Sequence, residues 1–307
     1  MRFGEHQTFH IREGWLFKGM AAIDEAEVKG LPPAIFLDDN APERLGIGRN
    51  MVRSLRFWMQ ATGLTTERKE QNRSVQRLTP FGKLIWAHDR YLENEATLWL
   101  IHYHLVCSQD QAATWYWFFN HYAPVTFDEQ TFLESLSTWV ITAKPDKKVA
   151  QSSLRKDVGC LLKTYLADNE LHTPENLIES PFAQLRLLSE VENGPQKRYR
   201  LERLNPTRLD PLVLLFVIVD RQTQEQSRTN QVRLSQVLRE PMNAGRVFNL
   251  TTAALSNLLT ELNKQHPDWS VQFIRTSGLD QLTLPQVKPL EILQRYYTEQ
   301  ATVLEVN

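Results

Sequence analysis

The spacing of apolar residues constrains this chain most, because it repeats with a helical period through much of the sequence. Apolar side chains at positions i, i+4, i+7, i+8 and i+11 predict an amphipathic helix. The clearest series is Leu154, Val158, Leu161, Leu162 and Tyr165. Residues 95–107 are apolar on nearly every face, which predicts a helix buried inside its domain.

Strand-like segments are short by comparison. They are residues 64–66, 75–78, 199–204, 271–274 and 282–284. Long helical patterns with a few short strands predict a mainly α fold with small β-hairpins.

The length of 307 residues favours two domains. Seven of the eight tryptophans lie at or before Trp139, so we expect an aromatic-rich helical core in the first half alone. The aromatic run 115–119 resembles a base-stacking platform, but such density inside a helical domain favours a core role. We place the domain boundary near residue 175, with domains over 1–175 and 176–307.

Charge and composition exclude several classes of protein. The net charge is −1, so binding to nucleic acid or to a membrane would require a local basic patch. Two cysteines are too few for a disulfide framework or a four-thiolate zinc site. There is no apolar signal segment and no run of about 20 apolar residues, which a membrane span requires. The sequence predicts a cytoplasmic protein without a membrane partner.

Residues 44–83 carry the strongest functional signal, with nine basic residues against two acids. Arg49, Arg53 and Arg56 share one face of a predicted helix, because they lie at i, i+4 and i+7. An apolar stripe on the neighbouring face lets the helix dock while its arginines point outward.

Two short strands joined by a charged loop over residues 65–74 follow this helix, which is the order of a winged helix. Such a helix enters the DNA major groove while the hairpin reaches adjacent phosphates. The residues predicted to contact DNA are Arg44, Arg49, Asn50, Arg53, Arg56, Arg68, Lys69, Arg73 and Arg77. The alternative is a solvated basic face, or one that pairs with acids elsewhere in the fold.

A second unit of similar order lies near the C-terminus. Residues 232–238 and 251–265 predict two helices, and residues 271–284 predict a hairpin. This winged-helix-like domain has a weaker basic signal, and such modules also serve as dimerisation or scaffold domains.

The N-terminal segment contains the candidate catalytic residues Glu5, His6, His10 and Arg12. His6 and His10 would share a helix face, but Gln7 cannot act as a base or a carboxylate ligand, and no HExxH motif is present. Two interpretations stay open: histidines that anchor the segment by hydrogen bonds, and a metal-binding or acid–base role.

Several strings recur together in a pattern that resembles a known family. They are Phe3-Gly4, Arg12-Glu13-Gly14-Trp15-Leu16, the run Leu45 to Ser54, Tyr91-Leu92-Glu93, the run Thr97 to His102, Trp115-Tyr116-Trp117 and Phe119-Asn120. The chain resembles the bacterial SspB-like family, a domain of unknown function encoded beside DNA phosphorothioation enzymes. Where that family commonly has an acid after its first histidine, Gln7 stands here.

This resemblance implies a component of a system that replaces a non-bridging phosphate oxygen of DNA with sulfur in defence against phage. It also implies three partners, a cysteine desulfurase, an ATPase and a sulfurtransferase, and an activity that nicks DNA, for which a divalent metal could be needed. The leading hypothesis is a DNA-binding component of such a system that could also nick DNA. The alternative is a non-enzymatic winged-helix scaffold or transcription regulator.

Overall fold

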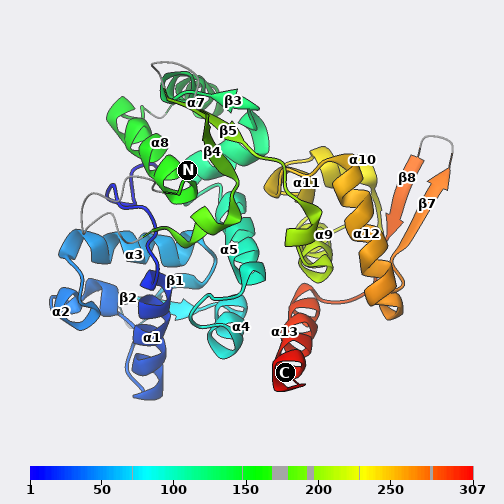
Figure 1. Cartoon of the computed structure of the whole chain (residues 1–307). Coiled ribbons are helices and arrows are strands. Elements are labelled where there is room, and N and C mark those ends of the chain that lie inside the picture. Colours follow the sequence, from blue (N-terminus) through cyan, green and yellow to red (C-terminus); the bar gives the residue numbers. More distant parts are fainter. Residues whose placement is uncertain are drawn as a thin grey trace. The chain divides into compact units, whose positions relative to one another are not determined.

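Helices carry most of the fold in the computed structural model, as the apolar spacing predicts (Figure 1). The structure describes residues 1–70, 72–146, 148–167, 179–191, 197–227, 229–276 and 279–306. Among these residues every helix is too short or too polar to cross a lipid bilayer. The mainly α class with small hairpins is confirmed.

The chain forms two compact units, Met1–Phe118 with Pro124–Glu202, and Phe119–Ala123 with Arg203–Asn307. The boundary expected near residue 175 falls in the stretch 168–178, outside the described residues. The first unit reaches Glu202, and its strands Leu188–Val191 and Arg198–Leu201 pair with each other.

The first unit begins with helices that pack around a two-stranded hairpin. Its elements in this part are α1 (Trp15–Val28), a 3-10 turn (Ile35–Leu37), α2 (Ala41–Leu45), α3 (Arg49–Ala61), β1 (Thr65–Glu70), β2 (Arg73–Leu78) and α4 (Pro80–His88). The antiparallel register pairs Thr65 with Leu78 and Glu70 with Arg73. The charged stretch 65–74 is therefore mostly strand, whereas the sequence predicts a loop there.

Local sequence explains where these elements begin and end. Gly63 links α3 to β1 with φ +71°, and a Cβ atom there would lie 2.9 Å from the ring of His104, so glycine is required. The Thr79 hydroxyl accepts a 2.9 Å hydrogen bond from the N–H of Gly82, and Pro80 occupies the first turn of α4.

The rest of the first unit is the aromatic helical core. It comprises α5 (Glu95–Cys107), α6 (Ala113–Trp117), β3 (Thr126–Phe127), α7 (Glu129–Ala143), α8 (Gln151–Tyr165), a 3-10 turn (Pro181–Leu185), β4 (Leu188–Val191) and β5 (Arg198–Leu201). Strands β3, β5 and β4 form a sheet in that order. Helix α5 is buried as predicted, and all five aromatic side chains of the run 115–119 are buried, so the core interpretation of that run is confirmed.

The second unit repeats the order of helices followed by a hairpin. Its main elements are all but the first residue of a π-helical turn (Phe118–Tyr122), α9 (Pro211–Gln224), β6 (Gln231–Arg233), α10 (Leu234–Arg239), α11 (Ala244–Val247), α12 (Thr252–Gln265), β7 (Gln272–Thr276), β8 (Leu279–Thr283) and α13 (Pro289–Val306). Strand β6 pairs with β8 and closes a three-stranded sheet in the order β6-β8-β7. The predicted helices and hairpin of this domain are present.

Candidate nucleic-acid interface

Helix α3 presents a polar face with arginines at its N-terminal half. The side chains of Arg49, Asn50 and Arg53 are exposed, whereas Arg56 is partly buried. Val52, Leu55, Phe57, Trp58 and Met59 are buried on the opposite side and hold the helix in the unit. The amphipathic pattern therefore orients the first two arginines as the sequence predicts.

Arg56 is held by an acid of the hairpin. Its guanidinium donates hydrogen bonds of 2.8 and 2.5 Å to the two carboxylate oxygens of Glu67. Ser74 donates a 2.5 Å bond to the same carboxylate, and Gln60 donates one of 3.1 Å. Burial opposes ionisation of Glu67, but the hydrogen bonds from Arg56, Ser74 and Gln76 outweigh it and lower its pKa.

A second ion-pair network neutralises Arg77 and Arg68 on the hairpin. Arg77 contacts Glu70 at 2.7 Å and Glu27 of α1 at 2.9 Å, and Arg68 contacts Glu70 at 2.6 Å. The hydrogen bond from Arg77 is the main cause that lowers the pKa of Glu70 to about 2, and Glu70 in turn raises the pKa of Arg77.

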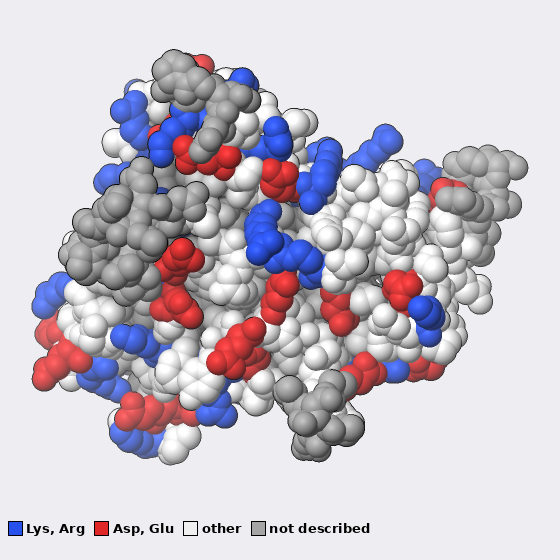
Figure 2. Space-filling view, viewed as in Figure 1, with Lys and Arg blue, Asp and Glu red and all other residues white. Residues whose placement is uncertain are grey.

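Arg44 is also placed among acids. It lies 3.9 Å from Glu25 and 3.8 Å from Asp38. Figure 2, drawn in the view of Figure 1, shows basic and acidic side chains next to one another over the region of α1 and α2. The continuous basic ridge that the sequence predicts is therefore partly neutralised by acids from α1, β1 and the loop before α2.

Four of the predicted DNA-contact residues keep an uncompensated charge. In the part of the chain that the structure describes, no carboxylate lies within ion-pair distance of Arg49, Arg53, Lys69 or Arg73. All four side chains are exposed. They lie on α3 and at the tip of the β1–β2 hairpin, the two elements that the winged-helix interpretation directs toward DNA.

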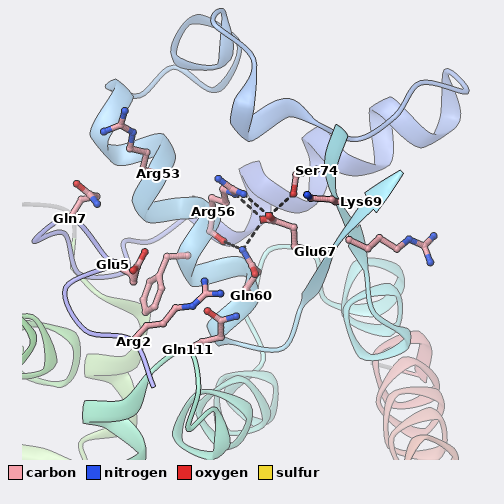
Figure 3. A pocket seen from close by; sticks show the side chains of 12 residues that line it. Arg2, Glu5, Gln7, Arg53, Arg56, Gln60, Glu67, Lys69, Ser74 and Gln111 are labelled. Atoms are coloured by element: carbon pink, nitrogen blue, oxygen red, sulfur yellow. Dashed lines mark hydrogen bonds and ion pairs between the residues drawn. The ribbon is translucent and has the colours of Figure 1, made fainter. Parts of the chain in front are cut away.

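A polar groove of about 540 Å³ opens between α3, the hairpin and the N-terminal segment (Figure 3). Its lining residues are Arg2, Glu5, Gln7, Arg53, Arg56, Phe57, Gln60, Glu67, Arg68, Lys69, Ser74 and Gln111. Figure 3 shows Arg2 extending beside Gln111 toward Gln60. Five of these residues are cations and two are acids, and one of the acids, Glu67, is engaged by Arg56.

The four candidate catalytic residues lie in different environments. Glu5 lines the groove, whereas His6 is 1% exposed and lies inside the unit. The guanidinium of Arg12 lies 5.7 Å from the ring centres of both Phe9 and Trp15, in a cation–π arrangement. His10 is partly exposed. Among the described residues that line the groove, Glu5 is the one member of these four.

His6 has the anchoring role that the sequence offered as one of two interpretations. Its Nε2 lies 2.9 Å from Asp157 Oδ1 of α8, and the N–H of Thr8 donates to its Nδ1 at 3.1 Å. Since Nδ1 accepts, the ring carries its proton on Nε2 and donates it to Asp157. Thr114 donates to the other oxygen of Asp157 at 2.6 Å, so both oxygens of the buried carboxylate accept hydrogen bonds.

Metal ligands do not gather in the described part of the chain. Within the residues that the structure describes, no three side chains of His, Cys, Asp or Glu come together as a set that could hold a metal ion.

Arg2 and Gln111 are groove residues that sequence reasoning missed. Neither belongs to the basic segment 44–83, and neither lies in a periodic pattern. Arg2 reaches the groove because the N-terminal segment folds back against α8 and α3, a long-range contact that has no local signal in the sequence. Gln111 lies in the connection between α5 and α6.

Comparison with known proteins finds solved structures with a similar fold. Two solved structures, described as "SspB crystal structure" and "Magnesium ion-bound SspB crystal structure", are similar to the chain with TM-scores of 0.85 and 0.84. Each is 25% identical, over 96% of this chain and 88% of theirs. No curated protein sequence matches the chain. The fold is thus that of SspB.

Residues 3–297 also match a protein family described as "Protein of unknown function (DUF4007)". The chain belongs to this family. The resemblance to the SspB-like family, inferred from short strings of residues, is thereby confirmed.

Proposed function

We propose that this protein is a DNA-binding component of a DNA phosphorothioation system. The observation that carries the proposal is the set of exposed, uncompensated cations on α3 and the hairpin tip: Arg49, Arg53, Lys69 and Arg73. In a winged-helix arrangement α3 faces the duplex and the hairpin acts as the wing, with Asn50 beside the arginines. Such side chains bind the phosphate backbone.

The paired cations have a different role in this proposal. Arg44, Arg56, Arg68 and Arg77 hold the hairpin and the loop before α2 in place through their acids. They support the interface, while the four uncompensated cations contact phosphates. Because the whole chain has a net charge of −1, affinity depends on these local contacts and weakens as salt rises.

We extend the proposal to the biological setting that the resemblance to the SspB-like family implies. That setting is a place beside a cysteine desulfurase, an ATPase and a sulfurtransferase in sulfur modification of DNA, as part of defence against phage, and the similarity of the fold to SspB supports it. The alternative is a scaffold or transcription regulator that uses the same helices without a catalytic step.

Salt-dependent binding tests the proposal. The affinity of the purified protein for a duplex of random sequence is measured by fluorescence anisotropy over a range of salt concentrations. These four phosphate contacts together contribute about −3.6 to the log–log slope, at about 0.9 per contact. Absence of binding, or a slope near zero, would contradict the proposal.

Strand nicking is a second candidate activity, favoured by similarity to a structure described as magnesium-ion-bound SspB. Magnesium is commonly held by one or two carboxylates with water, and Glu5 offers one carboxylate in the groove. Supercoiled plasmid incubated with the protein and Mg²⁺ or Mn²⁺ should become open circles, and Glu5→Gln should slow the conversion. Plasmid that stays supercoiled with either metal would favour the scaffold or regulator.

A further inference from the structure

We infer that His6 is a positioning residue that, together with Asp157, holds the N-terminal segment as one wall of the groove and so places Arg2 on the DNA-contact surface. This inference rests on the proposed function. It concerns a part of the interface that lies outside the basic segment 44–83.

Residues 4–9, the part of the segment beside the groove, are fixed at two points that belong to different helices. The N-terminal amine of Met1 also lies 3.1 Å from Oδ1 of Asp110, a solvent-exposed ion pair of the kind that contributes little. At the first point, His6 and the N–H of Gly4 bond to Asp157 of α8, at 2.9 and 2.7 Å. At the second point, the carbonyl of Phe9 accepts bonds from Trp58, at 3.1 Å, and from Ser54, at 3.3 Å, both of α3. Residues 4–9 therefore bridge α8 and α3 beside the groove.

The backbone between the two points is held in a conformation that costs free energy. Gln7 and Thr8 have φ values of 53° and 71°, in the left-handed region that residues other than glycine rarely occupy. Such conformations persist where surrounding contacts impose them. The bond from the Thr8 N–H to the His6 ring is such a contact, so the ring fixes the turn as well as its connection to α8.

The contact between His6 and Asp157 is buried and packed between aromatic rings. The ring lies between Phe57 and Trp115 in edge-on contacts with centroid distances of 6.1 and 5.8 Å. His6 and Asp157 are 1% and 2% exposed. The buried pair is itself out of reach of DNA, whereas Arg2 is exposed and Glu5 and Gln7 line the groove (Figure 3).

A double-mutant cycle tests this role by the salt slope of DNA binding. Arg2→Ala should reduce the magnitude of the slope by about 0.9, the value of one phosphate contact. His6→Ala should cause the same loss, because it releases the segment that carries Arg2. The double variant should lose no more than either single variant, and His6→Gln, whose amide can still donate to Asp157, should restore most of the slope.

Two results would overturn the inference: a wild-type slope for Arg2→Ala or His6→Ala, or losses that add in the double variant. Should His6→Ala fail to fold, Gly4→Ala is the milder variant, because it strains the φ of +72° at that residue while its Cβ meets Ser153 only at 3.5 Å. It is expected to cause the same loss, and an unchanged slope would again contradict the inference.

Arg53→Ala is the reference that separates the two proposals. If it leaves the slope unchanged as well, the proposed function fails. If it lowers the slope while His6→Ala and Gly4→Ala leave it unchanged, only the positioning role fails.

Discussion

Arg56 and Glu67 meet through two hydrogen bonds, of 2.8 and 2.5 Å, that join α3 to β1. Arg53 lies on the preceding turn of the same helix and is exposed without an acid in ion-pair range among the described residues. Two arginines that look alike in the sequence therefore have different environments. One connects a helix to a hairpin, and the other is available to a phosphate.

This difference predicts opposite effects of two substitutions. Arg53→Ala should lower the salt slope of DNA binding by about 0.9 and leave thermal stability unchanged. Arg56→Ala should destabilise the fold by about 1 to 2 kcal/mol, because a partly buried carboxylate loses its partner. Thermal denaturation measures the stability of both variants, and fluorescence anisotropy at several salt concentrations measures their salt slopes. Adding Glu67→Gln to Arg56→Ala should recover part of the stability, and an Arg56→Ala variant as stable as wild type would contradict the assignment.

The sequence predicts α3 and the hairpin well because their signals are local. The apolar stripe of Val52, Leu55 and Met59 specifies a helix wherever that segment lies. Thr79 and Pro80 mark the start of the next helix in the same way.

The partners of the charged residues are not predictable by such means. Glu27, which pairs with Arg77, is 50 residues away on α1, and Asp157 is 151 residues from His6. Which cations stay uncompensated is decided by these long-range contacts. The sequence predicts the basic segment. The tertiary fold determines which of its cations are exposed with no carboxylate in ion-pair range among the described residues.

Burial of His104 predicts a loss of stability in mild acid. Burial lowers the pKa of His104 to about 4 in the folded protein, from an ordinary value of 6.5. The unfolded chain takes up a proton as pH falls through 6.5, and the folded protein does not until about pH 4, so stability declines between these values. The shift corresponds to about 3 kcal/mol.

The measurement is the free energy of unfolding in urea at several pH values, compared between wild type and His104→Gln. The other histidines are the same in both proteins, so the difference between the two isolates His104. That difference should change between pH 6.5 and pH 4 in the direction that favours the variant in acid. A constant difference would show that His104 does not contribute to the acid sensitivity.

Two glycines in helices are predicted to respond in opposite ways to alanine. A Cβ atom at Gly82 would clash with the carbonyl oxygen of Leu64, so Gly82→Ala should force α4 away from the chain before β1. We expect a cost of about 1 to 3 kcal/mol, as for other overpacked sites. Gly159 of α8 has open space around its Cβ position, and Gly159→Ala should stabilise by about 0.5 to 1 kcal/mol. Melting temperatures that moved the same way in both variants would contradict these contacts.

The most direct test of the account is the salt slope of DNA binding in a variant that carries Gln at Arg49, Arg53, Lys69 and Arg73. The four side chains are exposed and uncompensated in the described structure, so the variant should fold and melt as the wild type does. A control with the same change of charge replaces exposed Lys29, Arg155, Lys156 and Lys163. We predict that the first variant loses between three and four units of slope, at about 0.9 per contact, and that the control keeps the wild-type slope. Equal slopes in wild type and the first variant would contradict it.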